Sequence, residues 1–211
     1  MEELFRKKVQ KKLDQELNNL GFKKKKYYYY CTKDRDSSLS IHVGNRRSYE
    51  KGVVILSVSV GVAIHSVNEL YIKLTDCQNN PDVSIYSPIV CKNMGYIMPQ
   101  NSYKEWRFEE KNFVEQSLTE LVESIKKYAF QYYEDRNGNS KIEYYVKETN
   151  EVTTKMARDE YYPIILFLSD RKDEAVQYVK CVLDNKQHSG LEEEYYKKFA
   201  ENFLQLDRLY K

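Results

Sequence analysis

A long stretch of alternating side chains places the strongest constraint on how this chain folds. From Val53 to His65 the sequence reads VVILSVSVGVAIH. One set of alternate positions carries only larger apolar residues, namely Val54, Leu56, Val58, Val60, Val62 and Ile64. The positions between them include the smaller residues Ser57, Ser59, Gly61 and Ala63. Because successive side chains of a strand point to opposite faces, this alternation predicts a β-strand with one buried face.

Two shorter segments upstream predict two more strands. Residues 27–31 read YYYYC, and tyrosine is a favoured strand residue. Residues 39–43 read LSIHV and alternate apolar with more polar side chains. Turn-forming residues separate the three segments, DRDSS at 34–38 and SYEKG at 48–52. The three strands are therefore expected to form an antiparallel meander.

The register between the first two of these strands stays open at this point. Either Tyr30 or Cys31 lies opposite Ile41. A slip of one residue between these choices exchanges the two faces of the strand. The sequence therefore does not decide which tyrosines of the block face the core.

Helical spacing dominates the rest of the chain. Apolar residues recur at three- and four-residue steps through residues 2–20, and Gly21 then suits the left-handed residue that ends a helix. The following Phe22 is expected to fold back on the last turn. A second helical pattern runs from about Val114 to the Asn137-Gly138 pair, which stops it.

Shorter elements are expected between and after these helices. Ser66–Glu69 matches a capping box and predicts a short helix through about residue 75. Residues 103–109 alternate, with Trp106 and Phe108 on one face of a further strand. Residues 77–102 receive no assignment. A helix beginning near Asp159 would place Pro163 in a first turn, where proline is tolerated, and two more helices follow within residues 175–183 and 191–206.

The predicted fold class is α+β. An antiparallel β-meander packs with an N-terminal and a long central helix, and a helical C-terminal appendage follows. We expect an α+β domain at residues 1–140 and the appendage at residues 141–211, packed on the first domain.

The charge of the chain is uneven along its length. Its 211 residues carry a formal net charge of +2. Residues 1–51 hold 14 Lys/Arg and 7 Asp/Glu, a net +7, whereas residues 52–211 hold 20 and 25, a net −5. A basic first segment attracts an acidic partner or the acidic remainder of the same chain. A dedicated DNA-binding protein is usually more basic overall.

The cysteines and the N-terminal residues favour a cytoplasmic protein. The four cysteines are widely spaced and form no CxxC pair, so reduced thiols are expected rather than a disulfide framework. The N-terminal sequence MEELFRKKVQ is charged and lacks the apolar core of a signal peptide, and no later run resembles a membrane span.

Several segments together are similar to a known bacterial family. The amphipathic first helix, the residues LGFKK at 20–24, the aromatic strand and VSVGVAIH resemble the domain of unknown function 4304 family. The segment FVEQSLTELVESIKKYAFQYYED resembles that family's closing helix, so the likeness covers roughly residues 3–135. The resemblance implies an α+β cytosolic protein with no assigned activity and no catalytic residues to carry over. Related small bacterial proteins include suspected immunity partners of toxins.

Motifs of catalysis and cofactor binding are missing from the sequence. The spacing of the glycines gives neither GxGxxG nor GxxxxGK, which excludes the common phosphate-binding loops. His42, His65 and His188 form no metal-ligand cluster, and His42 is expected to pair near residue 60, well short of His65. Residues 135–142 imitate the start of a calcium loop, but Val146 stands where the bidentate glutamate is required. We therefore predict no catalytic residue, no metal and no cofactor.

The block KKKKYYYY at residues 23–30 carries the candidate binding surface. Alternation lets only one pair of its tyrosines face the core, and we expect the Tyr27/Tyr29 pair to remain exposed. Basic residues nearby complete a candidate partner-binding surface, which consists of Tyr27, Tyr29, Lys24, Lys26, Arg46 and Arg47.

Three hypotheses of function follow from these patterns. The favoured one is a non-enzymatic protein-binding module. An immunity-type partner of a toxin is one protein of this class. The alternative is a nucleic-acid-binding protein that uses lysines and stacked tyrosines. The third is an enzyme without a recognisable motif, motivated only by the size of the chain.

Overall fold

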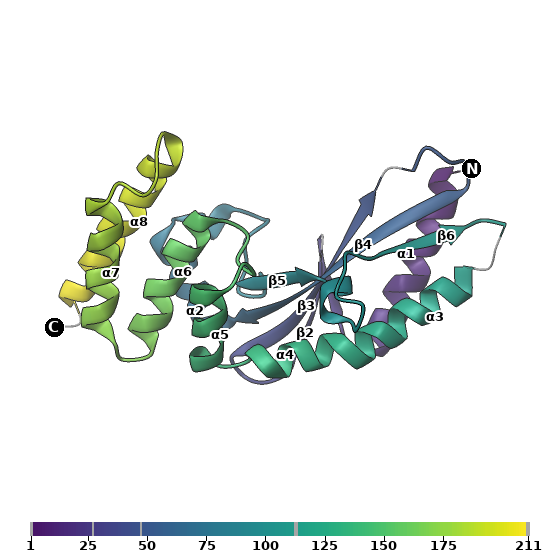
Figure 1. Ribbon diagram of the computed structural model, residues 1–211, viewed down its shortest axis with the longest axis horizontal. Coiled ribbons are helices and arrows are strands. Elements are labelled where there is room, and N and C mark those ends of the chain that lie inside the picture. Colours follow the sequence, from purple (N-terminus) through teal and green to yellow (C-terminus); the bar gives the residue numbers. More distant parts are fainter. Residues whose placement is uncertain (1, 27, 47, 112–113, 210–211) are drawn as a thin grey trace. The chain divides into compact units, whose positions relative to one another are not determined.

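The chain forms two compact units, which are shown together in Figure 1. The computed structural model describes residues 2–26, 28–46, 48–111 and 114–209. The first unit comprises Met1–Val62 and Cys91–Asp135, and the second comprises Ala63–Val90 and Arg136–Lys211. An antiparallel sheet and helices make up the fold, so the predicted α+β class is confirmed.

The boundaries of the units differ from the expected division at residue 140, because residues 63–90 belong with the helical unit. Helix α2 (His65–Leu74) in this segment finds its partners far along the chain. The ring of Tyr71 stacks on that of Tyr161, with 4.7 Å between the centroids. The side chain of Asn202 donates a 2.7 Å hydrogen bond to the carbonyl of Leu74.

The sheet follows the predicted meander and extends it. Its strands are β1 (Lys23–Lys25), β2 (Tyr28–Thr32), β3 (Ser37–Arg46), β4 (Val53–Ile64), β5 (Val90–Asn93) and β6 (Glu105–Glu109). They lie in the order β1-β2-β3-β4-β5, and β6 also pairs with β4. The long alternating segment therefore became the central strand.

The apolar face of the sheet forms the core of the first unit. On β4, Leu56, Val58 and Val60 are at most 1% exposed. Trp106 and Phe108 of β6 lie opposite Leu56 and Val54 and are also buried, as predicted. Helices α1 (Glu2–Asn19) and α3 (Val114–Ser124) contribute further buried apolar residues: Phe5, Val9, Leu13, Leu17, Leu118, Leu121 and Val122.

Both predicted helix ends of this unit are confirmed. Gly21 has a φ of +86°, a left-handed value that glycine adopts without strain. The amide of Phe22 folds back to donate a 2.9 Å hydrogen bond to the carbonyl of Leu17. Helix α3 continues through a π-helical turn, η3 (Ile125–Ala129), into α4 (Phe130–Arg136), and the chain then turns at Gly138 with a φ of +98°.

A hydrogen-bond network around Tyr29 joins β2 to α1. The Tyr29 hydroxyl donates a 2.5 Å bond to Oδ1 of Asp14 and accepts a bond from Gln10. Lys24 reaches the same carboxylate at 3.0 Å. Burial raises the pKa of the Asp14 carboxyl, but the hydrogen bonds from Tyr29, Gln10 and Lys24 outweigh burial and hold that pKa below its usual value.

The register of β2 differs from both alternatives considered. Tyr29, rather than Tyr30 or Cys31, lies opposite Ile41. Tyr29 is 3% exposed, so the prediction that it remains at the surface is wrong. The physical reason is the carboxylate of Asp14, which gives the buried tyrosine hydroxyl a charged acceptor.

The second unit is helical. Besides α2 it contains α5 (Asn139–Glu148), α6 (Lys155–Leu168), α7 (Lys172–Asp184) and α8 (Leu191–Leu209). Short 3₁₀ turns are η1 (Cys77–Asn79) in this unit and η2 (Met94–Ile97) in the first.

Two local predictions are wrong, one for the start of α2 and one for the start of α6. Helix α2 begins at His65 without a side-chain cap, and Asn68 of the expected capping box instead donates to the carbonyls of Ile85 and Ser87.

Helix α6 begins earlier than predicted. Thr154 caps it by accepting a 3.0 Å bond from the amide of Ala157, so the helix starts at Lys155 rather than near Asp159. Pro163 consequently lies in the interior of the helix. A proline there removes one intrahelical hydrogen bond. The buried residues around it, from Asp159 to Phe167, stabilise the helix through packing instead.

A buried ion pair lies at the start of the second unit. Arg136 donates from Nε and Nη2 to the two carboxylate oxygens of Glu151, at 2.7 and 2.9 Å. The guanidinium carbon lies 3.9 Å from the centroid of the Tyr145 ring. Both charged side chains are at most 10% exposed. Such a bidentate pair is geometrically specific, and each partner depends on the other for compensation of its charge.

Tyr29→Phe is expected to lower the free energy of unfolding by about 1–3 kcal/mol, because it leaves Asp14 and Gln10 without their shared partner. Urea denaturation followed by Trp106 fluorescence measures the change. Tyr96→Phe is the control, since Tyr96 is 42% exposed in the same unit. Equal stability of the two variants would contradict the role of the network.

Glu151→Ala is expected to destabilise the second unit by about 3–5 kcal/mol, because a buried guanidinium loses its partner. Hydrogen exchange of amides in α6 reports the change locally. The double variant Arg136→Met/Glu151→Leu should recover much of the loss, since no buried charge remains. A double variant as unstable as Glu151→Ala would show that the charge is not the cause.

Candidate protein-binding surface

The structure separates the residues predicted to form one surface. Lys24 and Tyr29 are engaged with Asp14 of α1, as described above. Lys26 adopts a left-handed conformation, with a φ of 50°, directly after β1. Tyr27 and Arg47 lie outside the described residues. Arg46 is exposed and lies at the end of β3.

Arg46 belongs to a different group of side chains. Its Nη1 donates a 2.9 Å bond to Oε1 of Glu105 on β6. The Tyr103 hydroxyl lies 2.9 Å from the same carboxylate oxygen and 3.1 Å from the hydroxyl of Ser57 on β4. The Arg46 guanidinium lies 5.9 Å from the centroid of the Tyr103 ring. These four residues, Arg46, Ser57, Tyr103 and Glu105, are called the Tyr103 cluster below.

Strand alternation explains why this cluster forms. Glu105 lies directly opposite Ser57, and Trp106 and Phe108, which alternate with Glu105 and Arg107 along β6, face the core. Glu105 and Ser57 therefore share the other face of the sheet, called the polar face here. Tyr103, two residues before Glu105, is 46% exposed, although its hydroxyl is bound. The result is a tyrosine ring held in place at the surface.

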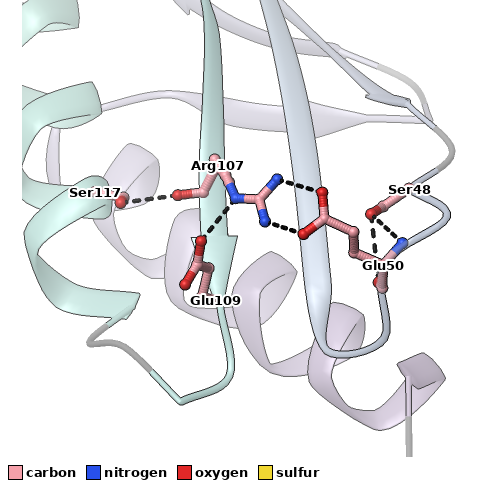
Figure 2. A network of polar contacts seen from close by, with 5 residues as sticks. All are labelled: Ser48, Glu50, Arg107, Glu109 and Ser117. Atoms are coloured by element: carbon pink, nitrogen blue, oxygen red, sulfur yellow. Dashed lines mark hydrogen bonds and ion pairs between the residues drawn. The ribbon is translucent and has the colours of Figure 1, made fainter.

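A second network on the polar face surrounds Arg107, which Figure 2 shows. Arg107 forms a bidentate pair with Glu50 of the β3–β4 connection and donates a 2.7 Å bond from Nε to Glu109. The hydroxyl of Ser117 on α3 donates to the Arg107 carbonyl at 2.9 Å. Arg107 lowers the pKa of the Glu50 carboxyl through this hydrogen bond and its charge. The network holds the connection and the start of α3 against β6.

The ion pairs give the polar face a mixed charge. Arg46 and Arg107 each have a carboxylate partner, Glu105 and Glu50 respectively. A protein that binds nucleic acid neutralises phosphates with cations that are available for contact. Cations already paired with carboxylates contribute less to such binding. Tyrosine and arginine are instead enriched at surfaces that contact proteins.

A groove with a volume of about 620 Å³ lies beside the cluster. Its lining residues are Glu3, Arg6, Asn45, Arg46, Ser48, Val53 and Val54. Val53 and Val54 are buried, with 7% and 6% of their surface exposed, so the apolar part of the lining is small, while both arginines are exposed. We call it the Arg6 groove. Arg46 therefore contributes to both the Tyr103 cluster and this groove.

Ionisable groups also gather inside the second unit. Asp159 of α6 accepts a 2.6 Å bond from the Tyr178 hydroxyl and lies 3.0 Å from Nε2 of His188. This short contact between Asp159 and His188 lacks the alignment of a hydrogen bond. The His188 ring lies 4.9 Å from that of Tyr196. Because Asp159, His188 and Tyr196 are all buried, the group favours a structural role, in which it anchors the α7–α8 connection.

No metal centre is found in the part of the chain that the structure describes, since no three His, Cys, Asp or Glu side chains come together there. Within the same described ranges, no helix is both long enough and apolar enough to cross a bilayer.

Sequence reasoning missed the residues that accompany Arg46. Ser57, Tyr103 and Glu105 lie far apart in the chain and meet only through strand pairing. The alternation around Trp106 and Phe108 held a usable signal, because it placed residues 103, 105 and 107 on the opposite face. Arg6 carried no signal, since it is one of many exposed basic residues on an amphipathic helix.

No family model, curated protein or solved structure matches the chain in the comparisons. The resemblance to the domain of unknown function 4304 family therefore stays a prediction.

Glu160 makes the stability of the second unit depend on pH. Burial raises the pKa of this carboxyl from 4.5 to about 7. Between these values the unfolded chain loses the proton and the folded unit keeps it. The contribution of Glu160 to stability is therefore full below pH 4.5 and is lost as the pH rises to about 7, by about 3 kcal/mol at most.

Glu160→Gln is expected to flatten this dependence between pH 5 and pH 8, because glutamine stays neutral. Hydrogen exchange of α6 amides across that range, corrected for the intrinsic rates, measures it. Glu194→Gln, at an exposed position of α8, is the control and should retain the wild-type slope. An unchanged slope in Glu160→Gln would assign the dependence to other groups.

Proposed function

We propose that the chain is a non-enzymatic protein-binding module and that the polar face of its first unit carries the binding surface. The observation that supports this most directly is the Tyr103 cluster. An exposed ring is fixed there by hydrogen bonds of its hydroxyl to Glu105 and Ser57 and is flanked by Arg46.

The residue types favour a protein partner. Tyrosine and arginine are enriched among the residues that contribute most to protein–protein binding energy. A side chain that is already ordered loses less conformational entropy on binding than a mobile one. Tyr103 and Arg46 meet both conditions, since each is held by Glu105 and each remains accessible.

The nucleic-acid alternative loses its main support. It relied on the lysines at 23–26, on Arg46 and Arg47, and on an exposed tyrosine pair, for which Tyr27 and Tyr29 were expected. Tyr29 is buried, and Lys24 pairs with Asp14. An immunity-type partner of a toxin, which the family resemblance implies, is one member of the protein-binding class. The four free cysteines are in keeping with our proposal that the protein acts in the cytoplasm.

Tyr103→Ala is expected to weaken binding of the natural partner at least about ten-fold, as for a central aromatic contact residue. A photo-crosslinking amino acid at position 103 first captures the partner in the native host. Calorimetry with the purified partner then compares the variant with the wild type.

Tyr144→Ala is the matched control, because Tyr144 is 59% exposed on α5 of the second unit. It should bind the partner as the wild type does. Equal affinities of Tyr103→Ala and the wild type, or crosslinks from position 144 to the same partner, would contradict the assigned surface.

A further inference from the structure

The Arg6 groove presents two guanidinium groups that can accept an anion. Among the described residues no ion pair is recorded for Arg6, which is exposed on α1. Arg46 uses Nη1 for Glu105. A guanidinium carries five N–H donors, so the bond to Glu105 leaves donors for a second carboxylate. The same bond also holds Arg46 in position.

The acidic residue that lines the groove is already neutralised. The carboxylate of Glu3 pairs with Lys7 at 2.8 Å, one turn further along α1. The positive charge of Arg6 therefore determines the sign of the potential in the groove, because Glu105 offsets much of the charge of Arg46. The residues assigned to the first unit carry 20 Lys/Arg and 15 Asp/Glu, a net +5, against a net −3 for the second.

We propose that the Arg6 groove binds an acidic segment of a partner protein, in which carboxylates contact Arg6 and Arg46 and an apolar side chain contacts Val53 and Val54. The inference rests on the proposed function and adds the chemistry of the partner. Asn45, which also lines the groove, offers hydrogen bonds to a peptide backbone.

The lining fits a peptide better than a nucleic acid. The groove has an apolar patch formed by Val53 and Val54, and the described lining includes no aromatic ring. Binding of single strands typically uses aromatic rings on which bases stack, together with a row of cations that follows the backbone. A peptide that alternates acidic and apolar side chains matches two arginines beside two valines.

Fluorescence anisotropy with defined peptides tests the proposal on the full chain. The acidic probe consists of three Asp-Leu-Glu-Ser repeats, and its neutral counterpart consists of three Asn-Leu-Gln-Ser repeats. A labelled twelve-residue oligothymidine is the nucleic-acid probe. Each is titrated at low and at moderate salt with the wild type and with Arg6→Ala, Arg46→Ala and Arg35→Ala.

The wild type is expected to bind the acidic probe at least ten-fold more tightly than the neutral one, with weaker binding at higher salt. Arg6→Ala and Arg46→Ala should each lower the affinity for the acidic probe about ten-fold, which corresponds to the loss of one hydrogen bond to a charged group. Arg35→Ala removes the same charge at an exposed position outside the groove and should bind as the wild type does. Circular dichroism confirms that each variant is folded.

Three results would overturn the proposal. The first is equal binding of the acidic and neutral probes. The second is unchanged binding of the acidic probe in Arg6→Ala and Arg46→Ala. The third is tighter binding of the oligothymidine than of the acidic probe, with the oligothymidine weakened by the same two substitutions. Each leaves the proposed function standing if Tyr103→Ala still weakens the natural partner. If instead the probe binds as expected while Tyr103→Ala leaves the natural partner unaffected, the groove is confirmed and the Tyr103 surface is wrong.

Discussion

The hydrogen bond between Tyr29 and Asp14 determines how the first unit is arranged. It joins the strand next to the sheet's first edge to helix α1, and it fixes which side of that strand faces inward. Because side chains alternate along a strand, one inward residue determines on which face of the sheet each neighbouring residue lies. Lys24 and Ile41, which lie on either side of Tyr29 in the sheet, consequently share the face toward α1.

The same bond decides what the basic block contributes to the surface. Lys23 lies opposite Tyr30 and Lys25 lies opposite Tyr28, so these four residues share the other face of the sheet. Tyr28 and Tyr30 are half-buried there. The block thus divides into an inner set, which stabilises the contact with α1, and an outer set. Lys24 and Tyr29, which belong to the inner set, are engaged with Asp14 and do not contribute to a cationic and aromatic surface.

Periodicity predicted the parts of the fold whose burial is local in sequence. The alternation of β4, the Trp106/Phe108 face of β6 and the end of α1 at Gly21 all follow from residues within a few positions of one another. The long helix that ends before Gly138 belongs to the same class.

The features that sequence did not predict depend on distant partners. The face of β2 depends on Asp14, which lies in another element. The start of α6 depends on Thr154 and on packing that tolerates an interior proline. The assignment of residues 63–90 to the second unit depends on α6 and α8, to which α2 binds through Tyr161 and Asn202. The Tyr103 cluster likewise exists only after β3, β4 and β6 have come together.

Arg46 connects these structural conclusions with the proposed binding. Among the described members of the predicted surface, two are exposed and lie outside the Tyr29 network. They are Arg46 and Lys26, and Lys26 lies in the turn after β1. The bond of Arg46 to Glu105 has two opposite effects on a carboxylate ligand. The bond orders the guanidinium, which reduces the entropy lost on binding, while the Glu105 charge weakens the attraction of any second anion.

These two effects determine what kind of selectivity the groove can have. Attraction at long range is modest, because Glu105 offsets much of the Arg46 charge. Of the two arginines of the groove, only Arg6 has no ion-pair partner among the described residues. Selectivity must therefore arise at contact. There, an ordered guanidinium binds a ligand carboxylate best when that carboxylate lies at the correct distance from an apolar side chain of the same ligand. A highly charged polymer gains little from such an arrangement. A short acidic and apolar segment gains from both the arginines and the valines.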